Sequence, residues 1–167
     1  GLTSSPGHSL TRIDPTTNQA TKTISLGPAS LGPFGVALAG GLVWVANHDG
    51  SPSISLSKVD EATMKVVGTV PIGTATDSGP VKVVSTAGSI WTNLAGESVV
   101  LRINPQTDAI QARIPVASSC GGLVADDTTI WVACGAGDGC APGLSRIDST
   151  ANAVTATNAG PRRHDPA

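Results

Sequence analysis

Polar residues in segments expected to be loops are the groups in this chain that could do chemistry. His48 is followed directly by Asp49, and this pair is the best candidate for acid–base catalysis. Asp77 and Glu97 could add oxygen ligands for a hard divalent cation. The same set of predicted loops contains three further polar residues, Ser78, Ser119 and Asp138.

The sequence motifs of well-known catalytic sites are missing. There is no Ser-His-Asp order, no phosphate-binding loop and no zinc helix of the His-x-x-Glu type. The alternative interpretation of His48 is a solvated loop histidine. The catalytic residues therefore stay unassigned beyond His48 and Asp49, and we predict no metal site and no cofactor. A divalent cation is expected only if the chain is an enzyme.

The chain has three cysteines, Cys120, Cys134 and Cys140. If a hairpin is centred on residue 127, Cys120 and Cys134 lie directly opposite each other and a disulfide is geometrically plausible. A hairpin centred on residue 137 would instead place Cys140 opposite Cys134. Either pairing leaves one thiol over, and a disulfide fits an oxidising compartment. A zinc site is the third alternative, although Cys-x5-Cys without a nearby histidine is a poor zinc spacing.

The elements that must position these residues form a sequence repeat. Four aliphatic anchors each follow a basic residue and precede Asp or Asn: Arg12-Ile13-Asp14, Lys58-Val59-Asp60, Arg102-Ile103-Asn104 and Arg146-Ile147-Asp148. A second phrase, "LVWVAN", "SIWTNL" and "TIWVAC", contains all three tryptophans, Trp44, Trp91 and Trp131. Self-similarity at a nearly fixed period indicates a repeat architecture.

Each repeat unit is predicted to contain four short strands. Apolar and polar residues alternate over short stretches bounded by Gly, Pro, Asn or Asp, and no segment has helical periodicity. Tight hairpins are expected at 39–41, 87–88 and 126–127, where the residue types tolerate positive φ. The Asp or Asn after each anchor is expected to accept hydrogen bonds from its own turn. Four antiparallel strands in a unit of about 40 to 50 residues is the size of a β-propeller blade.

Composition and charge exclude several classes of function. Only 13% of the residues are charged, the formal net charge is -2 and no run of basic residues occurs, so we expect no nucleic-acid partner. No apolar stretch approaches the roughly 18 residues of a membrane span, so none is expected in this segment. The initial "GLTSSPGHSL" has neither an initiator Met nor an apolar signal core.

The pattern resembles a known group of propellers. The phrases "GPFGVA", "LVWVAN", "LTRIDPTTN" and "TISLG" are similar to those of bacterial extracellular β-propellers of the YVTN, NHL and virginiamycin B lyase-like group. The resemblance runs from about Ser9 to Gly160 and implies an all-β propeller of four-stranded blades. It says little of function, because the group includes lyases, other enzymes and members that only bind. In its lyases, histidines and a glutamate around the channel assist a metal-dependent elimination, and that motif has no residue-by-residue match here.

The predicted blades amount to about three and a half, a partial ring over residues 1–160 with a tail at 161–167. They are a half blade at 9–26 and full blades at 34–71, 80–115 and 121–157. A closed ring needs at least four blades. We therefore expect either a fragment of a longer protein or a half-ring that associates head to tail as a homodimer.

Two repeated sets of side chains are predicted to be structural rather than functional. Trp44, Trp91 and Trp131 occupy one register of the second strand, where packing between blades explains them better than ligand stacking does. The basic residues before the anchors are expected to face outward from the third strand and to pair locally.

Three hypotheses of function follow. The first is a secreted or cell-surface binding module whose protein or small-molecule ligand lies at one mouth, formed by loops with His48, Asp49, Asp77, Glu97, Ser119 and Asp138. The second is a propeller lyase or hydrolase with a divalent cation at the channel mouth. The third is the extracellular sensor domain of a receptor or kinase. All three imply an extracellular, periplasmic or cell-surface location.

Overall fold

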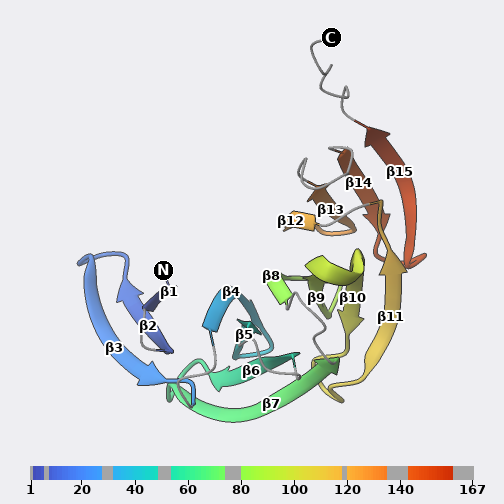
Figure 1. Ribbon diagram of the computed structural model, residues 1–167. Coiled ribbons are helices and arrows are strands. Elements are labelled where there is room, and N and C mark those ends of the chain that lie inside the picture. Colours follow the sequence, from blue (N-terminus) through green and yellow to red (C-terminus); the bar gives the residue numbers. More distant parts are fainter. Residues whose placement is uncertain are drawn as a thin grey trace. The chain divides into compact units, whose positions relative to one another are not determined.

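The computed structural model describes residues 2–5, 8–27, 32–48, 54–73, 80–117, 120–134 and 143–159 (Figure 1). Every regular element in this part is a β-strand, apart from a single 3-10 turn, η1 (Ala95–Glu97). The strands form three four-stranded sheets and one three-stranded sheet, in which neighbours along the chain are neighbours in the sheet. The protein is therefore all-β, as its sequence predicts, and each sheet is a propeller blade.

The first of two compact units, Gly1–Val83, is built on two blades. Blade one has three strands: β1 (Leu2–Ser5), β2 (Ser9–Asp14) and β3 (Gln19–Ser25). Blade two has four: β4 (Gly32–Ala39), β5 (Leu42–His48), β6 (Ile54–Asp60) and β7 (Lys65–Gly73). The sequence repeat predicts only two strands in blade one, but β1 pairs with β2 as a third.

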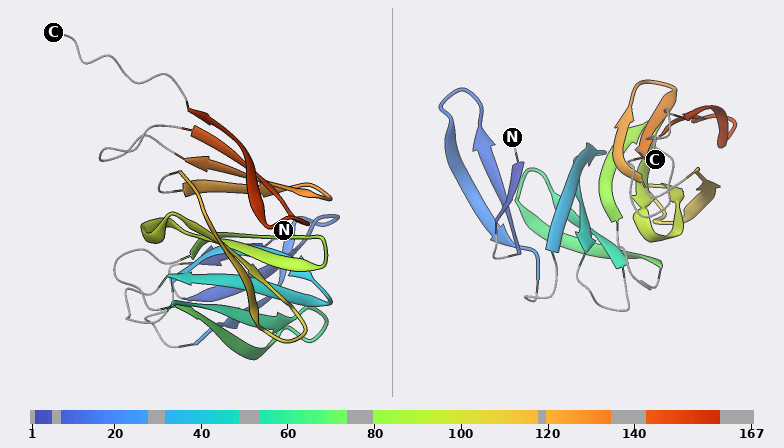
Figure 2. Two further views of the ribbon diagram at one scale, coloured as in Figure 1. Left: turned by 90° about the vertical axis from the view of Figure 1, so that its right-hand side faces the viewer. Right: turned by 45° about the horizontal axis from the view of Figure 1, so that its top comes forward.

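The second unit, Val84–Ala167, holds the other two blades, with the division falling inside β8. Blade three consists of β8 (Pro80–Thr86), β9 (Ser89–Leu94), β10 (Val99–Ile103) and β11 (Ile110–Pro115). Blade four consists of β12 (Cys120–Ala125), β13 (Thr129–Cys134), β14 (Gly143–Asp148) and β15 (Ala153–Ala159). The strong twist of these sheets is clear when they are seen edge-on (Figure 2). The predicted tail at 161–167 lies outside the described residues.

Each unit has a hydrophobic core between its two blades. In the first unit, Leu10 and Leu26 of blade one pack with Val43, Val45 and Val59 of blade two. In the second unit, the core joins side chains of blades three and four: Trp91, Val100, Ile114, Leu123, Ile130, Val132 and Ile147. Side chains alternate between the two faces of a strand, so alternate residues of one strand reach the core.

The turn between the last two strands has one geometry in all four blades. In blade four, Oδ1 of Asp148 accepts hydrogen bonds from the backbone N–H groups of Thr150 and Ala151, both at 2.8 Å. The residue that ends the turn, Asn152, has a φ of 54° and donates its N–H to the Asp148 carbonyl. Asp14, Asp60 and Asn104 cap the other three turns in the same way, which confirms the predicted role of these residues.

The turns between the first and second strands are of two kinds. Gly40, Gly41, Ala87 and Gly88 all have positive φ, as the sequence predicts for the hairpins of blades two and three. The prediction is wrong for blade four, where residues 126–127 do not have positive φ. There Asp126 instead accepts hydrogen bonds from the N–H groups of Thr128 and Thr129, so a side-chain cap replaces the left-handed backbone.

Within the described part of the chain, no helix has the length and apolar character that crossing a membrane requires.

The turn caps predict an acid-sensitive contribution to stability. Backbone N–H donors from Ala151 and Thr150 lower the pKa of Asp148, and the N–H of Thr16 lowers the pKa of Asp14. The pKa of Asp60 is lowered by the hydroxyl and then the N–H of Thr63. These contributions are present above the ordinary carboxyl pKa of 3.8 and are lost as the pH falls below it. The triple substitution of Asp14, Asp60 and Asp148 by Asn should keep the caps, because Asn104 already serves in blade three. Its melting temperature should therefore fall less between pH 5 and pH 3 than that of the wild type, as measured by circular dichroism.

Asp148→Ala, which removes a cap outright, is the control and should lower the melting temperature at neutral pH as well. An identical acid slope for the wild type and the triple Asn variant would contradict the assignment.

Candidate functional site

The strand order gives every blade two different ends. One end carries the turns described above, between first and second strands and between third and fourth strands, and we call it the turn end. The opposite end carries the connections between second and third strands, at residues 49–53, 95–98 and 135–142, and we call it the loop end. In blade three, the N–H of Val116, just after the fourth strand, donates to the carbonyl of Ser98 in this connection. Of the residues proposed for a functional mouth, His48 ends β5 and Glu97 lies in the connection at 95–98.

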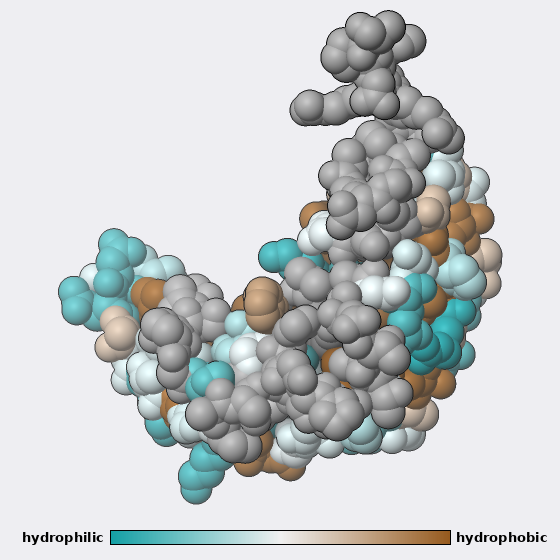
Figure 3. Space-filling model, viewed as in Figure 1, coloured by the Kyte–Doolittle hydropathy of each residue, from teal (hydrophilic) through white to brown (hydrophobic). Residues whose placement is uncertain are grey.

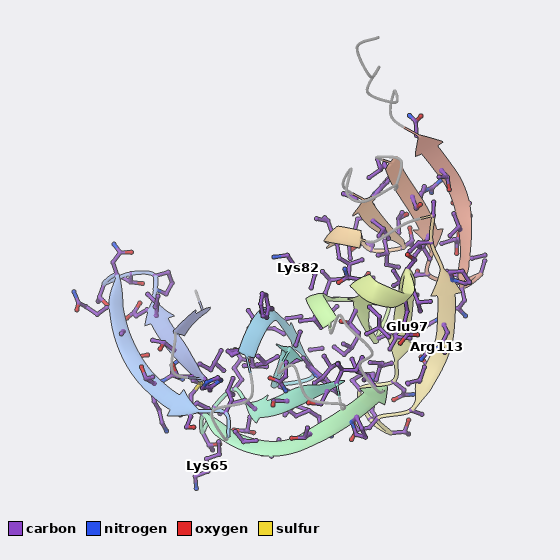
Figure 4. All side chains as sticks on the ribbon, viewed as in Figure 1. Lys65, Lys82, Glu97 and Arg113 are labelled. Atoms are coloured by element: carbon purple, nitrogen blue, oxygen red, sulfur yellow. The ribbon has the colours of Figure 1, made fainter. Side chains whose placement is uncertain are left out.

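Glu97 is the candidate at a loop end whose side chain the structure describes. It closes η1, and its Oε2 lies 2.5 Å from a terminal nitrogen of Arg113 on β11 (Figure 4). The two side chains are 37% and 46% exposed, so the pair is a surface ion pair. Arg113 compensates the charge of Glu97, and the part of Glu97 at the mouth stays a prediction.

The remaining mouth candidates are not brought together by the described structure. His48 is the last residue of β5, and its backbone is in register with Gly32. Asp49, Asp77, Ser119 and Asp138 lie outside the described residues, as does the side chain of His48. In the described ranges, no three His, Cys, Asp or Glu side chains form a group that could hold a metal ion. The shared location of these candidates stays a prediction.

The backbone register shows which residues lie opposite Cys120 and Cys134 in blade four. In blade four, Cys120 on β12 and Cys134 on β13 are direct partners across the hairpin, as expected for a turn centred on residue 127. Cys134 also pairs with Gly143 of β14, its neighbour on the other side. Cys140 lies outside the described residues.

A repeated pairing of tryptophan with a basic residue was missed by the sequence analysis. In each four-stranded blade, the tryptophan of the second strand is directly opposite the basic residue of the third strand. The cationic groups of Lys58, Arg102 and Arg146 lie 5.7, 5.3 and 5.9 Å from the ring centroids of Trp44, Trp91 and Trp131. These are cation–π contacts, and the constant alignment of the two phrases in the repeat was the signal that could have revealed them.

Arg102 also links blade three to blade four. Its Nε donates to Oγ of Ser89 at 2.8 Å, within its own blade. One terminal nitrogen donates to the carbonyl of Ser149 at 2.8 Å and to Oδ1 of Asn152 at 2.9 Å, both in the turn between β14 and β15. In the first unit, Nζ of Lys22 donates to the Thr63 carbonyl in the corresponding turn of blade two. A basic side chain of one blade thus binds the turn end of the next blade in both units.

The three tryptophans differ in burial. Trp44 and Trp91 have no exposed surface, and Trp91 packs in the core between blades three and four. Trp131 is 37% exposed, and Val124 and Leu144 beside it are also exposed. Its side chain lies on the face of blade four that points away from the core of the second unit, since Ile130 and Val132 point into that core.

Comparisons with known proteins define the fold and not the family. No protein-family model matches the chain, and no curated protein matches it. Among solved structures, hydrazine synthase of Kuenenia stuttgartiensis is similar over 95% of this chain and 48% of its own, with a TM-score of 0.77 and 16% identity. A protein of unknown function from Bacteroides caccae gives a TM-score of 0.66 at 14% identity, over 92% of this chain and 55% of its own.

A third structure, the computationally designed Ika8 protein, has a TM-score of 0.72 at 13% identity and covers 96% of this chain and 46% of its own. The chain therefore spans about half the length of the structures that it matches. At these identities the likeness shows the fold alone, which is that of a partial β-propeller.

The contacts of Arg102 predict a difference between two equivalent arginines. Arg102→Ala should lower the free energy of unfolding by about 2 kcal/mol, because it removes charge-assisted hydrogen bonds and a cation–π contact together. Arg146→Ala should cost less than about 1 kcal/mol, because the described contacts of Arg146 are with an exposed ring of its own blade. Urea unfolding monitored by tryptophan fluorescence measures both values. Equal losses would show that the bonds to Ser149 and Asn152 contribute nothing.

Proposed function

We propose that this chain is part of a secreted or cell-surface β-propeller, similar to the YVTN and NHL propellers, that acts by binding a protein or small-molecule ligand at its loop ends. The fold is compatible with many functions, so the proposal depends on the contrast between the two ends of the blades.

The turn ends are nearly uniform from blade to blade. In every blade the turn between the last two strands begins with a capping Asp or Asn and contains one residue with positive φ, at positions 18, 64, 108 and 152. Their polar groups are used within the fold, in caps and in the bonds from Lys22 and Arg102. A surface that is built the same way in every blade has little capacity to distinguish one ligand from another.

The loop ends differ from blade to blade in length and in sequence. The connections at 49–53, 95–98 and 135–142 have unlike compositions, "DGSPS", "AGES" and "GAGDGCAP". Variable loops carried on a regular scaffold are the common location of ligand specificity.

The cysteine register supports the proposed location of the protein. We infer that Cys120 and Cys134 form a cross-strand disulfide, because direct partners in an antiparallel pair have Cα atoms about 4.5 to 5.5 Å apart, within the range of a disulfide. Two thiols give up two protons and two electrons to a disulfide donor of the oxidising compartment, and one S–S bond forms. Such a bond persists outside the cytosol.

The loop-end proposal predicts that one graft removes binding and another does not. Replacing residues 135–142 by "AGES" from 95–98 should reduce binding to any hit on a peptide array or a glycan array by at least about tenfold. Replacing the turn 149–152 by "PTTN" from 15–18 is the matched control, since both turns have the same capped geometry, and should leave binding unchanged. Binding that survives the loop graft but not the turn exchange would overturn the proposal.

The enzyme alternative is tested on the same samples by calorimetric titration with Mn²⁺. Cation binding in the wild type that His48→Ala or Asp49→Ala abolishes, in the absence of array hits, would favour a cation-dependent reaction instead.

The proposed disulfide predicts a definite mass and thiol count. Protein made in an oxidising compartment should be about 2 Da lighter than after reduction, and peptide mapping should join Cys120 to Cys134. Cys140→Ser should keep this bond, whereas Cys134→Ser should remove it and lower the melting temperature. A peptide that joins Cys134 to Cys140 would contradict the assignment and support the alternative pairing.

A further inference from the structure

One face of blade four repeats a pattern that is buried in blade three. We call this surface, formed by Val124, Trp131, Leu144 and Arg146, the tail face. Trp131, Leu144 and Arg146 occupy the positions that Trp91, Val100 and Arg102 occupy in blade three, by the register of the strands. The tail face lies opposite the side of blade four that packs in the core with Ile130, Val132 and Ile147.

The two equivalent surfaces differ in what covers them. In blade three, Trp91 and Val100 are fully buried against blade four. In blade four, Val124 is 64%, Leu144 is 42% and Trp131 is 37% exposed. Clustered aromatic and aliphatic side chains beside a cation are typical of a binding surface and not of an ordinary solvent face.

The buried example defines the kind of surface that fits the tail face. Blade four covers Trp91 with aliphatic side chains from its second and third strands. It also presents the turn between β14 and β15, whose Ser149 carbonyl and Asn152 side chain accept hydrogen bonds from Arg102. The partner of the tail face therefore needs a β-sheet with small or aliphatic side chains and a capped turn that offers two oxygens.

Blade one of the same chain has such a surface on the side away from its own core. We call it the head face and define it by Thr11, Ile13 and Thr23, since Leu10 points to the core between blades one and two. Ile13 occupies the position of Ile147 in the repeat. The hydroxyl groups of Thr11 and Thr23 lie 2.9 Å apart and bond to each other.

The turn beside the head face also matches. Asn18 ends the turn of blade one with a φ of 55°, and Asn152 ends the turn of blade four with a φ of 54°. Asp14 caps the first turn as Asp148 caps the last. The hairpin between β2 and β3 forms a hydrophilic tip in Figure 3. An arginine that approaches this turn meets the oxygen atoms that Arg102 meets in blade four.

We propose that the tail face of one copy of this chain binds the head face of a second copy. Trp131 packs on Ile13 and the threonine methyl groups, and Arg146 donates to Asn18 and to the carbonyl of Pro15. The contact is heterologous, so each pair keeps one head face and one tail face for further copies. The head face offers Ile13 where blade four offers Leu123, Ile130, Val132 and Ile147, so the contact is weaker than the one between blades three and four. The proposal stands whether or not the loop ends bind a ligand.

The test is sedimentation velocity from about 5 to 500 µM, a range that detects micromolar association. The weight-average mass of the wild type should rise well above the monomer value of 16.6 kDa. Trp131→Lys blocks the tail face and Thr23→Lys blocks the head face, and each variant alone should stay monomeric. An equimolar mixture of the two should associate again, because it contains one intact tail face and one intact head face.

Val67→Lys is the matched control, since Val67 is 56% exposed on β7 and belongs to neither face, and it should associate like the wild type. Circular dichroism melts show whether each variant is folded, and Arg146→Ala, which keeps Trp131, should weaken association at least about threefold.

Three outcomes would overturn the proposal. A wild type that stays at the monomer mass throughout would show that a blade outside this chain, and not a second copy, covers the tail face. A Thr23→Lys variant that associates like the wild type, while Trp131→Lys does not, means that two tail faces bind each other. A mixture that fails to associate, although both variants are folded, excludes the head-to-tail contact.

Discussion

Each blade of this protein is a sheet with apolar side chains on both faces, and the rest of the structure depends on covering both of them. In β13, Ile130 and Val132 point to one side while Trp131 points to the other. A sheet with apolar side chains on both faces can bury them only by packing between two neighbours, so each repeat needs the next one. Burial of the two cores, in Gly1–Val83 and in Val84–Ala167, follows from this requirement. The face of blade four that carries Val124, Trp131 and Leu144 is not covered within the second unit, and these side chains are exposed.

Polar groups at the turn ends make this packing specific. The guanidinium of Arg102 covers the Trp91 ring and at the same time binds a carbonyl and an amide oxygen of the following blade. Apolar contact alone would allow two blades to slide, whereas directed hydrogen bonds fix one arrangement. The caps at Asp14, Asp60, Asn104 and Asp148 hold each turn in the shape that offers these oxygens. In blades two and four, the oxygens of the turn end are in this way bound by a basic side chain of the preceding blade.

Local patterns in the sequence predict most of this fold, and contacts between distant residues account for what they miss. The strand alternation and the capping Asp or Asn depend on residues close together in the chain, and the structure confirms both. The strand at Leu2–Ser5 lacks the tryptophan phrase and is recognisable only by its pairing with β2. The ion pair of Glu97 joins positions 16 residues apart in sequence across a blade, a contact that no local pattern indicates. Whether His48 and Asp49 act together depends on loops that no periodic pattern describes.

The solved structures with this fold show how little the blades themselves say about function. An enzyme named as hydrazine synthase and a computationally designed protein both match this chain, at 16% and 13% identity. Such distant sequences share the fold because a blade needs a pattern of alternating apolar residues and four good turns, and many sequences supply it. The information that distinguishes one propeller from another must therefore lie where the pattern is broken. In this chain those places are the loops of unequal length, the cysteine pair of blade four and the exposed tryptophan on its outer face.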